Sequence, residues 1–498
     1  MAHRRPSPGF ALLALWGLPT GIARAAPPNI VLISVDGLRA DRTHFGGNPR
    51  PTTPSLDAFV TEGMRFPLSF SQSNESAFSH ASMFTGRYAS EIAFPDYWRY
   101  LLPEEALSLP ELLGLAGYDT GAFIAGGHIK ASFGFSQGFD EFHEGPDFGS
   151  FFSTVPSALA WLEKRQSDKP FFLFLHGYDC HRPYAADSVF HHAFEGGAQG
   201  RLDQALFRQS FSESVYQGTY YPSFRHELVE HANGELILDP EGYSTLASYV
   251  ADYQGDDAVK LSKAQLDHVL AHYDGSVLAA DTYVGLFLDA LREQGLWEDT
   301  LVVVTSDHGE DLQTHGYYNH RAVLFDSTTR VPLVLGGGAL PPALRGVTRP
   351  ELTAAVDLVP TLAEVAEIAS PADARGRSLW PLTKGQETLP KPHVYQEGVL
   401  GQTSLRTATH RLVFSGYALT DPDYLRHLIQ APLGGGAFAL YHTAQDVEEA
   451  HDVLKEQSEL ATELRRAMVT IAADLVQGSA QQELSPELRE MMRENGYW

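Results

Sequence analysis

A strand that ends in two metal-ligand side chains constrains the fold of this chain more than any other stretch. Residues 301–305 read LVVVT, a run with strong β propensity, and Asp307, His308 and Gly309 follow after one serine. In open parallel sheets the active site lies at the carboxyl ends of the strands, so we expect Asp307 and His308 at that edge. Taken alone, an Asp-His pair is more often a polar turn after a core strand, and its weight comes from the rest of the chain.

A second strand of the same design lies near the amino terminus. Residues 29–35 read NIVLISV, and Asp36 and Gly37 follow them directly. Asp-Gly is also a frequent hairpin turn, but residues 38–42 do not continue as a second strand. Two strands therefore present an aspartate at the same end.

The remaining pattern alternates strands with helices. Apolar positions recur at helical spacing over residues 265–294, Gly295 is placed to end that helix, and the 301–305 strand follows, as in a parallel crossover. Further strands are predicted at residues 120–124, 171–175 and 330–335, and a further helix at 350–366. The fold class that follows is α/β, with a large central, mostly parallel sheet flanked by helices.

The first 25 residues fit a secretory signal peptide. They carry Arg4 and Arg5, an apolar run over residues 10–18 and a small-residue cleavage motif at residues 23–25. The apolar run is about half as long as a span that crosses a bilayer, which makes a membrane anchor the weaker alternative. We expect an exported protein, periplasmic or secreted, with no transmembrane segment in the mature chain.

The mature chain divides into two parts. Residues 26–388 form the expected catalytic domain, with a polar, glycine-rich insertion at about 186–262 that lacks clear periodicity. A proline-rich stretch at residues 389–393 marks a boundary, and residues 389–498 read as a smaller α+β domain with a helix near 456–475.

Charge argues against a nucleic-acid-binding protein, and cysteine content excludes an internal disulfide. The formal net charge of −26 argues against a nucleic-acid partner, because phosphate backbones are bound by clustered cations. Cys180 is the only cysteine, so the chain contains no internal disulfide even in an oxidising compartment.

Two further segments carry residues suited to ester chemistry. Residues 71–87 read SQSNESAFSHASMFTGR, in which small side chains allow a helix to begin with its amides aimed at an anion and a serine to act as nucleophile. The strand at 171–175 ends in a loop bracketed by His176 and His181. A serine-rich loop and packing histidines are the plainer interpretations, and the two aspartate strands argue against them.

Taken together, these segments resemble the sulfatase family of the alkaline phosphatase superfamily, and the resemblance covers nearly the whole mature chain. The markers occur in the expected order and are VDGLRAD, the 76–87 segment ending in TGR, GFSQGFDEF, the His176 to Tyr184 loop, YDGSV to LREQGL, TSDHGE, HRAVLFD, VDLVPTL, GRSL and ALYHTAQDVEE.

The resemblance implies one divalent metal ion held by Asp36, Ser76, Asp307 and His308. Many sulfatases have a second aspartate directly after the first, where this chain has Gly37. The loss of one hard oxygen ligand and the presence of an imidazole move the expected metal from calcium toward manganese or zinc.

The resemblance also assigns the candidate catalytic residues. Ser76 stands where sulfatases carry the cysteine or serine that is converted to formylglycine, but Phe78 and His80 replace the proline and arginine of the usual maturation pattern. This departure resembles the branch that keeps an unmodified serine or threonine. The remaining candidates are His80 itself, His128 from a Lys-x-His site whose lysine position holds Gly126, His181 as the leaving-group histidine, and His320 as a contact of the substrate anion.

The function that follows is that of an exported, metal-dependent hydrolase of small anionic esters. It cleaves sulfate esters, or phosphate or phosphonate esters, through a covalent Ser76 intermediate. One alternative is a phosphodiester or phosphonate monoester hydrolase, or a transferase that passes the group to an alcohol. Another is an inactive sulfatase-like binding protein. The substrate and the oligomeric state are left open, because the 186–262 insertion and the C-terminal domain give no recognisable pattern.

Overall fold

The structure is a computed structural model, and it describes most of the chain between residues 27 and 478. The described residues are 27–92, 101–182, 184, 190, 193–194, 229–230, 236–237, 263–316, 320–321, 323–386, 391–399, 401–416, 423–434 and 436–478. The predicted signal peptide lies outside them. So does nearly all of the 186–262 insertion, of which a two-stranded ribbon is described, β7 (Val229–Glu230) with β8 (Leu236–Ile237).

An eight-stranded sheet forms the centre of the molecule. In spatial order its strands are β11 (Val347–Thr348), β2 (Met64–Arg65), β10 (Leu333–Gly336), β9 (Thr300–Thr305), β1 (Asn29–Val35), β6 (Phe171–Gly177), β4 (Asp119–Ile124) and β5 (Glu141–Glu144). The run from β9 to β5 is parallel, while β10 is antiparallel to both of its neighbours. The predicted large, mostly parallel sheet is confirmed, and the strand expected at 330–335 lies at its antiparallel side.

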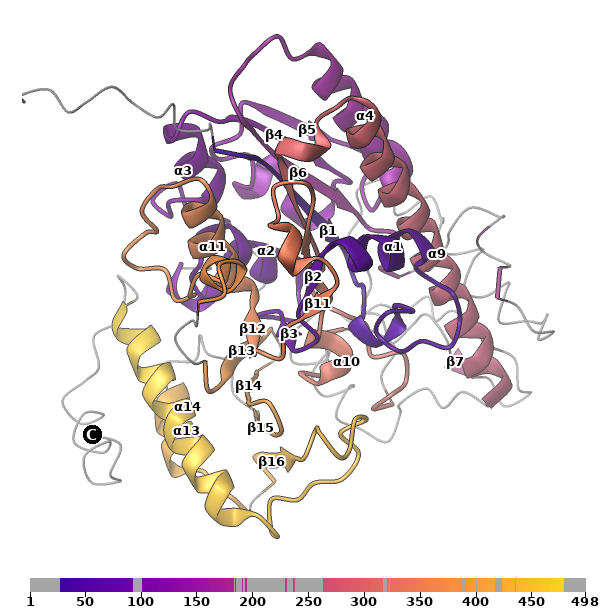
Figure 1. Cartoon of the computed structure of the whole chain (residues 1–498). Helices are drawn as coiled ribbons and strands as arrows, with labels where there is room; N and C mark the ends of the chain where they lie inside the picture. Colours follow the sequence, from indigo (N-terminus) through magenta and orange to yellow (C-terminus); the bar gives the residue numbers. More distant parts are fainter. Residues whose placement is uncertain are drawn as a thin grey trace, which may run out of the picture.

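Helices cover both faces of this sheet, as Figure 1 shows. One face carries α2 (Ser76–Thr85), α3 (Leu109–Leu115) and α11 (Leu358–Val365), and the other carries α1 (Pro54–Glu62), α4 (Phe151–Lys164) and α9 (Lys263–Glu293). Strand β1 contributes alternate residues to the two cores, Ile30 and Leu32 to the first and Val31 and Ile33 to the second. Burial on both sides explains why the strand sequences are continuously apolar.

The long helix before β9 is confirmed, because α9 leads through a short turn into β9, which is parallel to β1. The helix predicted at 350–366 is wrong in its first half. Residues Thr353–Ala354 form β12, which pairs with β3 (Ser69–Phe70), and α11 begins only at Leu358. The pairing of β12 with a distant segment overrides the local helical pattern.

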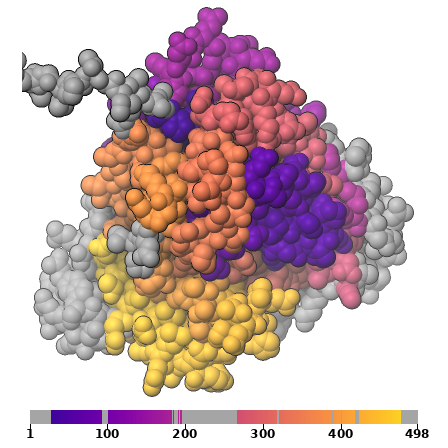
Figure 2. Space-filling view, viewed as in Figure 1, coloured from indigo at the N-terminus to yellow at the C-terminus, as the bar shows by residue number. Residues whose placement is uncertain are grey.

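The C-terminal part has its own sheet and core. The four antiparallel strands are β13 (Val394–Gly398), β14 (Gln402–Arg406), β15 (Arg411–Ser415) and β16 (Phe438–Tyr441), packed with α13 (Tyr424–Gln430) and α14 (Ser458–Gly478). In Figure 2 these residues, coloured from orange to yellow, cover one end of the molecule. The short helices α10 (Asp326–Thr329) and α12 (Trp380–Thr383) complete the fold. None of the described helices is long and apolar enough to cross a membrane.

Candidate active site

Three neighbouring strands bring the candidate residues to one edge of the sheet. Strand β1 lies between β9 and β6, with Ser34 opposite Thr305 and Val35 opposite Gly177. Asp36 therefore follows β1 at the level where Asp307 follows β9 and the His181 loop follows β6. This is the placement that the carboxyl ends of parallel strands predict.

Backbone amides fix the orientation of Asp307. Its Oδ1 accepts hydrogen bonds from the amides of Gly37, at 3.2 Å, and His308, at 2.9 Å. Its Oδ2 is buried and has no hydrogen-bond partner among the described residues, and the same is true of Asp36 Oδ1. Each aspartate thus leaves one oxygen available to a ligand.

These two carboxylates are close and fully buried, which favours a cation between them. Burial and the charge of Asp307 raise the pKa of Asp36 well above its usual range. Asp307 keeps a lowered pKa in spite of its burial, because His308 and two other histidines favour its charge. Two adjacent buried carboxylates of this kind share a proton unless a metal ion compensates them.

Ser76 lies over the aspartates at the first turn of α2. Its Oγ donates to Asp36 Oδ2 at 3.0 Å and lies 3.2 Å from His308 Nε2. Asn74, two residues before Ser76, holds this turn in place, because its side-chain amide donates to the carbonyls of His320, Arg321 and Val323 at 2.8, 3.1 and 2.9 Å respectively. The hydroxyl is therefore positioned by contacts on both sides of the residue.

The predicted metal ligands meet in the structure. The ligand atoms of Asp36, Asp307 and His308 lie within 4.8 Å of one another, all three residues are buried, and Ser76 Oγ contacts two of them. Two carboxylates, an imidazole and a hydroxyl suit a divalent ion such as manganese or zinc, so the residues present fit a metal at this place.

Gly37 explains why a second aspartate is absent after Asp36. The residue has φ +74°, and a Cβ built on it meets the carbonyl oxygen of Cys180 at 3.0 Å and the amide nitrogen of His181 at 3.1 Å. Any side chain there is strained by its backbone conformation and collides with the β6 loop. The tight turn that brings β1 against this loop therefore disfavours an extra carboxylate.

His80 contacts the backbone of Ser76 from within the same helix. It lies one turn along α2, fully buried, with Nδ1 2.8 Å from the Ser76 carbonyl oxygen and Nε2 3.0 Å from Ser34 Oγ. Burial lowers its pKa. Both ring nitrogens are thus engaged in positioning contacts, and the predicted catalytic role of His80 stays a prediction.

His128 belongs to a buried charged group around Glu75. The Nδ1 atom of His128 lies 2.9 Å from Glu75 Oε1, and Arg321 donates twice to the same carboxylate at 2.6 and 3.0 Å. Although burial opposes the charge of Glu75, Arg321 and His128 lower its pKa to about 2. Sequence reasoning missed Glu75 and Arg321, because the only signal for them is adjacency to Ser76 and His320.

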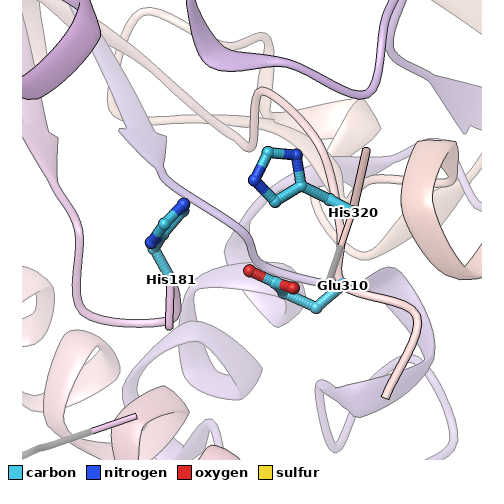
Figure 3. Close-up of side chains that lie close together, drawn as sticks. All are labelled: His181, Glu310 and His320. Atoms are coloured by element: carbon cyan, nitrogen blue, oxygen red, sulfur yellow. The ribbon is translucent and has the colours of Figure 1, made fainter. Parts of the chain in front are cut away.

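His181 and His320 meet beside the first cluster, together with Glu310, as Figure 3 shows. The three residues are buried, and their ligand atoms lie within 4.8 Å of one another. The ring of His320 stacks on that of His308 with centroids 4.1 Å apart. Glu310 lies in the TSDHGE segment, but nothing in its local sequence pattern predicts that its side chain turns inward.

The family of the chain is decided by its match to known sequences. The sulfatase family matches residues 28–368, more than half of the chain. The chain belongs to the sulfatase family. A second match, described as N-sulphoglucosamine sulphohydrolase, C-terminal, covers residues 313–474. The sulfatase chain is accordingly an enzyme, a hydrolase acting on sulfate or phosphate ester bonds.

Individual relatives of this sulfatase are distant but cover most of its length. The N-acetylglucosamine-6-O-sulfatase of Bacteroides thetaiotaomicron is 24% identical over 412 residues, 73% of this chain and 72% of the relative. Human arylsulfatase A is 26% identical over 487 residues, 88% of this chain and 86% of the relative.

Two solved structures share the fold. One is a protein in complex with its substrate D-glucosamine-2-N,6-O-disulfate, with a TM-score of 0.69 and 20% identity, covering 92% of this chain and 100% of that one. The other is the phosphonate monoester hydrolase of Agrobacterium radiobacter, with a TM-score of 0.66 and 18% identity, covering 92% and 98%. They confirm the predicted fold class.

Proposed function

We propose that this sulfatase-family chain is an exported, metal-dependent hydrolase that cleaves sulfate or phosphate esters through a covalent Ser76 intermediate. The observation that carries the proposal is the place of Ser76 Oγ, at the start of α2 and in contact with both Asp36 and His308. A nucleophile at a helix N-terminus faces the amide groups that favour a bound anion.

In the first step Ser76 Oγ attacks the sulfur or phosphorus atom of the ester, and the bond from that atom to the leaving oxygen breaks. The Ser76 proton passes to Asp36 Oδ2, which already accepts its hydrogen bond at 3.0 Å. His181 or His320 gives a proton to the leaving oxygen. Asp36, Asp307 and His308 would hold a divalent ion, whose positive charge would lower the pKa of the serine hydroxyl and attract the substrate anion.

In the second step water attacks the sulfur or phosphorus atom of the Ser76 ester. The bond to Ser76 Oγ breaks, Asp36 returns the proton to the serine oxygen, and the histidine that protonated the leaving oxygen takes a proton from the attacking water as the inorganic anion leaves. If an alcohol replaces water in this step, the enzyme is a transferase. Product analysis in the presence of added acceptor alcohols distinguishes a transferase from a hydrolase. The alternative of an inactive binding protein is set aside, because the chain is an enzyme of this family.

Whether residue 76 is serine or formylglycine decides whether sulfate esters or phosphate esters are cleaved faster. A formylglycine hydrate expels sulfate by collapsing to the aldehyde, whereas a serine ester must be cleaved by attack at the central atom. Phe78 and His80 break the maturation pattern, so we propose that Ser76 remains serine and that phosphate or phosphonate esters are turned over faster than sulfate esters. Relatives of both kinds, the sulfatases and the phosphonate monoester hydrolase, are compatible with this proposal.

One experiment tests the chemistry. The mass of the peptide containing residue 76 is measured, and turnover of a matched aryl sulfate and aryl phosphate is compared for the wild type and Ser76→Ala. We expect an unmodified serine, faster phosphate turnover, and no turnover by a Ser76→Ala protein that keeps its fold. Ordinary activity of Ser76→Ala refutes the covalent mechanism, and faster sulfate turnover with unmodified serine refutes the preference for phosphorus.

Export is tested separately. The signal peptide predicted at residues 1–25 lies outside the described residues. Amino-terminal sequencing of the protein recovered outside the cytoplasm is expected to show a mature chain that begins near Ala26. An uncleaved chain retained in the cytoplasm contradicts export.

A further inference from the structure

A strained aromatic residue lies beside the histidines of the active site. Phe148 is in the loop of residues 145–150, between β5 and α4, and its φ of +55° is a backbone conformation that a bulky side chain rarely adopts. Such strain persists only where surrounding contacts force it, and it is concentrated at binding and catalytic sites. Glycine would relieve the strain at this position, so the ring of Phe148 must supply something that glycine cannot.

Hydrogen bonds on both sides of Phe148 hold the loop in this conformation. Before it, Asp147 Oδ1 accepts from the amide of Gly127 at 3.0 Å. After it, the amide of Gly149 donates to the carbonyl oxygen of Ala125 at 3.2 Å. Both partners lie just after β4, so the end of that strand fixes the backbone on either side of the aromatic ring.

The ring of Phe148 lies among the rings of the active site. Its centroid is 5.8 Å from that of His128 and 6.0 Å from that of His181. The His181 ring lies 6.2 Å from that of His308, whose Nε2 contacts Ser76 Oγ. Phe148 and His128 are only partly buried, so a substrate can reach both rings.

The same loop explains why this chain has Gly126 at the lysine position of the Lys-x-His site. Gly126 has φ +67°, and a Cβ built on it meets Asp147 Oδ1 at 2.5 Å and Asp147 Cα at 2.8 Å. The loop that carries Phe148 thus occupies the space that a side chain at residue 126 needs. Lys130, the next lysine along the chain, is paired with Asp147 at 2.8 Å. Where the family pattern has a cation, this chain has a loop that carries an aromatic ring.

We propose that Phe148 determines specificity, because its ring lies against a flat ring in the alcohol portion of the substrate. The proposal rests on the function proposed above, in which His181 is one of two donors to the leaving oxygen. A ring attached to that oxygen comes next to Phe148, which is in contact with His181. Aromatic side chains bind other rings by offset or edge-to-face contact. The substrate class is therefore a sulfate or phosphate ester of a ring alcohol.

The first test compares esters with and without a ring. Values of kcat/KM are measured for phenyl phosphate and for hexafluoroisopropyl phosphate, whose alcohol has an acidity near that of a phenol but no ring. We expect Phe148→Ala to lower kcat/KM for the phenyl ester about tenfold and to change that of the acyclic ester less than about twofold. Equal losses on both esters overturn the proposal, since Phe148 then only supports the histidines.

Matched variants and a third substrate complete this comparison. Phe148→Tyr keeps the ring and should keep both activities, as should Phe152→Ala, which removes an exposed phenylalanine of α4. A loss by Phe148→Ala on a hexose phosphate extends the assignment to sugar rings, and no loss on it confines the assignment to aryl rings.

Stability separates the strain from the ring. Because glycine relieves a positive φ, Phe148→Gly should have a higher urea midpoint than Phe148→Ala, although both variants lose the preference for the phenyl ester. A lower midpoint in Phe148→Gly contradicts the strain from which the proposal starts.

A binding measurement distinguishes this proposal from the function on which it rests. Benzylphosphonate has a methylene group in place of the ester oxygen and is not hydrolysed there, and ethylphosphonate is its counterpart without a ring. In calorimetry on the full chain, we expect the wild type to bind benzylphosphonate about tenfold more tightly than ethylphosphonate, and Phe148→Ala to lose this preference. That result upholds the role of Phe148 even where no ester is turned over. Equal binding of the two by the wild type, or a preference that Phe148→Ala retains, overturns it even where esters are hydrolysed.

Discussion

At the scale of single residues, each side chain of the site has one polar atom held by a hydrogen bond and a second polar atom that faces the other site residues. Asp307 is held through Oδ1 and presents Oδ2, and Asp36 binds Ser76 through Oδ2 and presents Oδ1. His308 follows the same rule, with Nδ1 against the Gly309 carbonyl at 3.0 Å and Nε2 facing Ser76. Such preorganisation removes the need to reorder charged groups during the reaction.

Replacing Gly37 by alanine tests how tightly the turn after β1 is packed. The new methyl group meets Cys180 O at 3.0 Å in a backbone conformation with positive φ, so we expect the free energy of unfolding to fall by about 1–3 kcal/mol. Turnover should fall as well, since the Gly37 amide holds Asp307 at 3.2 Å. Urea unfolding and steady-state rates measure the two effects.

Gly295→Ala is the matched control, because Gly295 has φ +71° but open space around its Cβ position. It carries the backbone strain without the collision. Equal stability losses in the two variants, with full activity in Gly37→Ala, would show that the contact with Cys180 does not constrain the site.

Glu75→Gln tests the buried charged group that holds His128. Removal of the carboxylate charge breaks the buried ion pair between Glu75 and Arg321, and we expect a loss of roughly 3 kcal/mol in the free energy of unfolding at neutral pH. The pKa of Glu75 is lowered from 4.5 to about 2. Its contribution is therefore present above pH 4.5 and lost as the pH falls toward 2.

Chemical denaturation of both proteins across this pH range measures the effect. The difference between wild type and Glu75→Gln should be largest at neutral pH and shrink as Glu75 becomes protonated. Glu62→Gln, in an exposed pair with Arg292, should change stability by under about 1 kcal/mol at every pH. A constant difference between wild type and Glu75→Gln would contradict the assignment.

The meeting of Asp36 and Asp307 could be predicted from the sequence because two apolar runs end in aspartate, and parallel strands place such ends together. Glu310 and Glu75 could not, because their inward orientation depends on the loop after β9 and on the turn before α2. Arg39 shows the cause for the first loop, since its guanidinium donates to the carbonyls of Glu310 and Asp311 at 3.0 and 2.9 Å. Contacts from residues that are far apart in sequence leave no periodic signal.

At the scale of secondary-structure elements, the predictions that held were those with long apolar patterns, such as β1, β9 and α9. The helix expected at 350–366 failed where β12 pairs with β3. The caps of helices also come from distant segments. Helix α1 begins at Pro54 with no cap from Thr53, and Asp281 of α9 accepts from the amides of Ser55 and Leu56, both at 2.8 Å.

Asp281→Ala should therefore loosen one helix by a change in another. Two amides at the start of α1 lose their charged acceptor in a buried place, and we expect a loss of about 2–3 kcal/mol. Hydrogen exchange should show faster exchange in α1, together with a lower urea midpoint. Asp289→Ala, also on α9 but at an exposed position, should leave both unchanged. Unaltered exchange in α1 would exclude Asp281 as its cap.

At the scale of the whole molecule, a buried charged network joins the C-terminal sheet to the catalytic domain. Asp326, at the start of α10, accepts from Arg406 at 2.9 and 3.1 Å and from Arg411 of β15. Arg411 also donates to Glu449 at 2.7 Å. Since α10 follows His320 by a few residues, the network lies between the C-terminal sheet and one wall of the site. No sequence pattern pairs residues that are 80 to 85 positions apart.

Asp326→Asn should weaken this connection strongly. The substitution keeps the shape of the side chain but removes the charge that two buried arginines share, and breaking a buried pair in this way costs about 3–5 kcal/mol. We expect a lower guanidinium midpoint and, because the wall carrying His320 loosens, lower turnover. In Asp326→Asn/Arg406→Met the arginine that donates twice to Asp326 is also removed, so the double variant should be less unstable than the sum of the single variants. Strictly additive losses would show that the network does not couple the two parts, and the C-terminal sheet would then be attached to the catalytic domain by apolar packing alone.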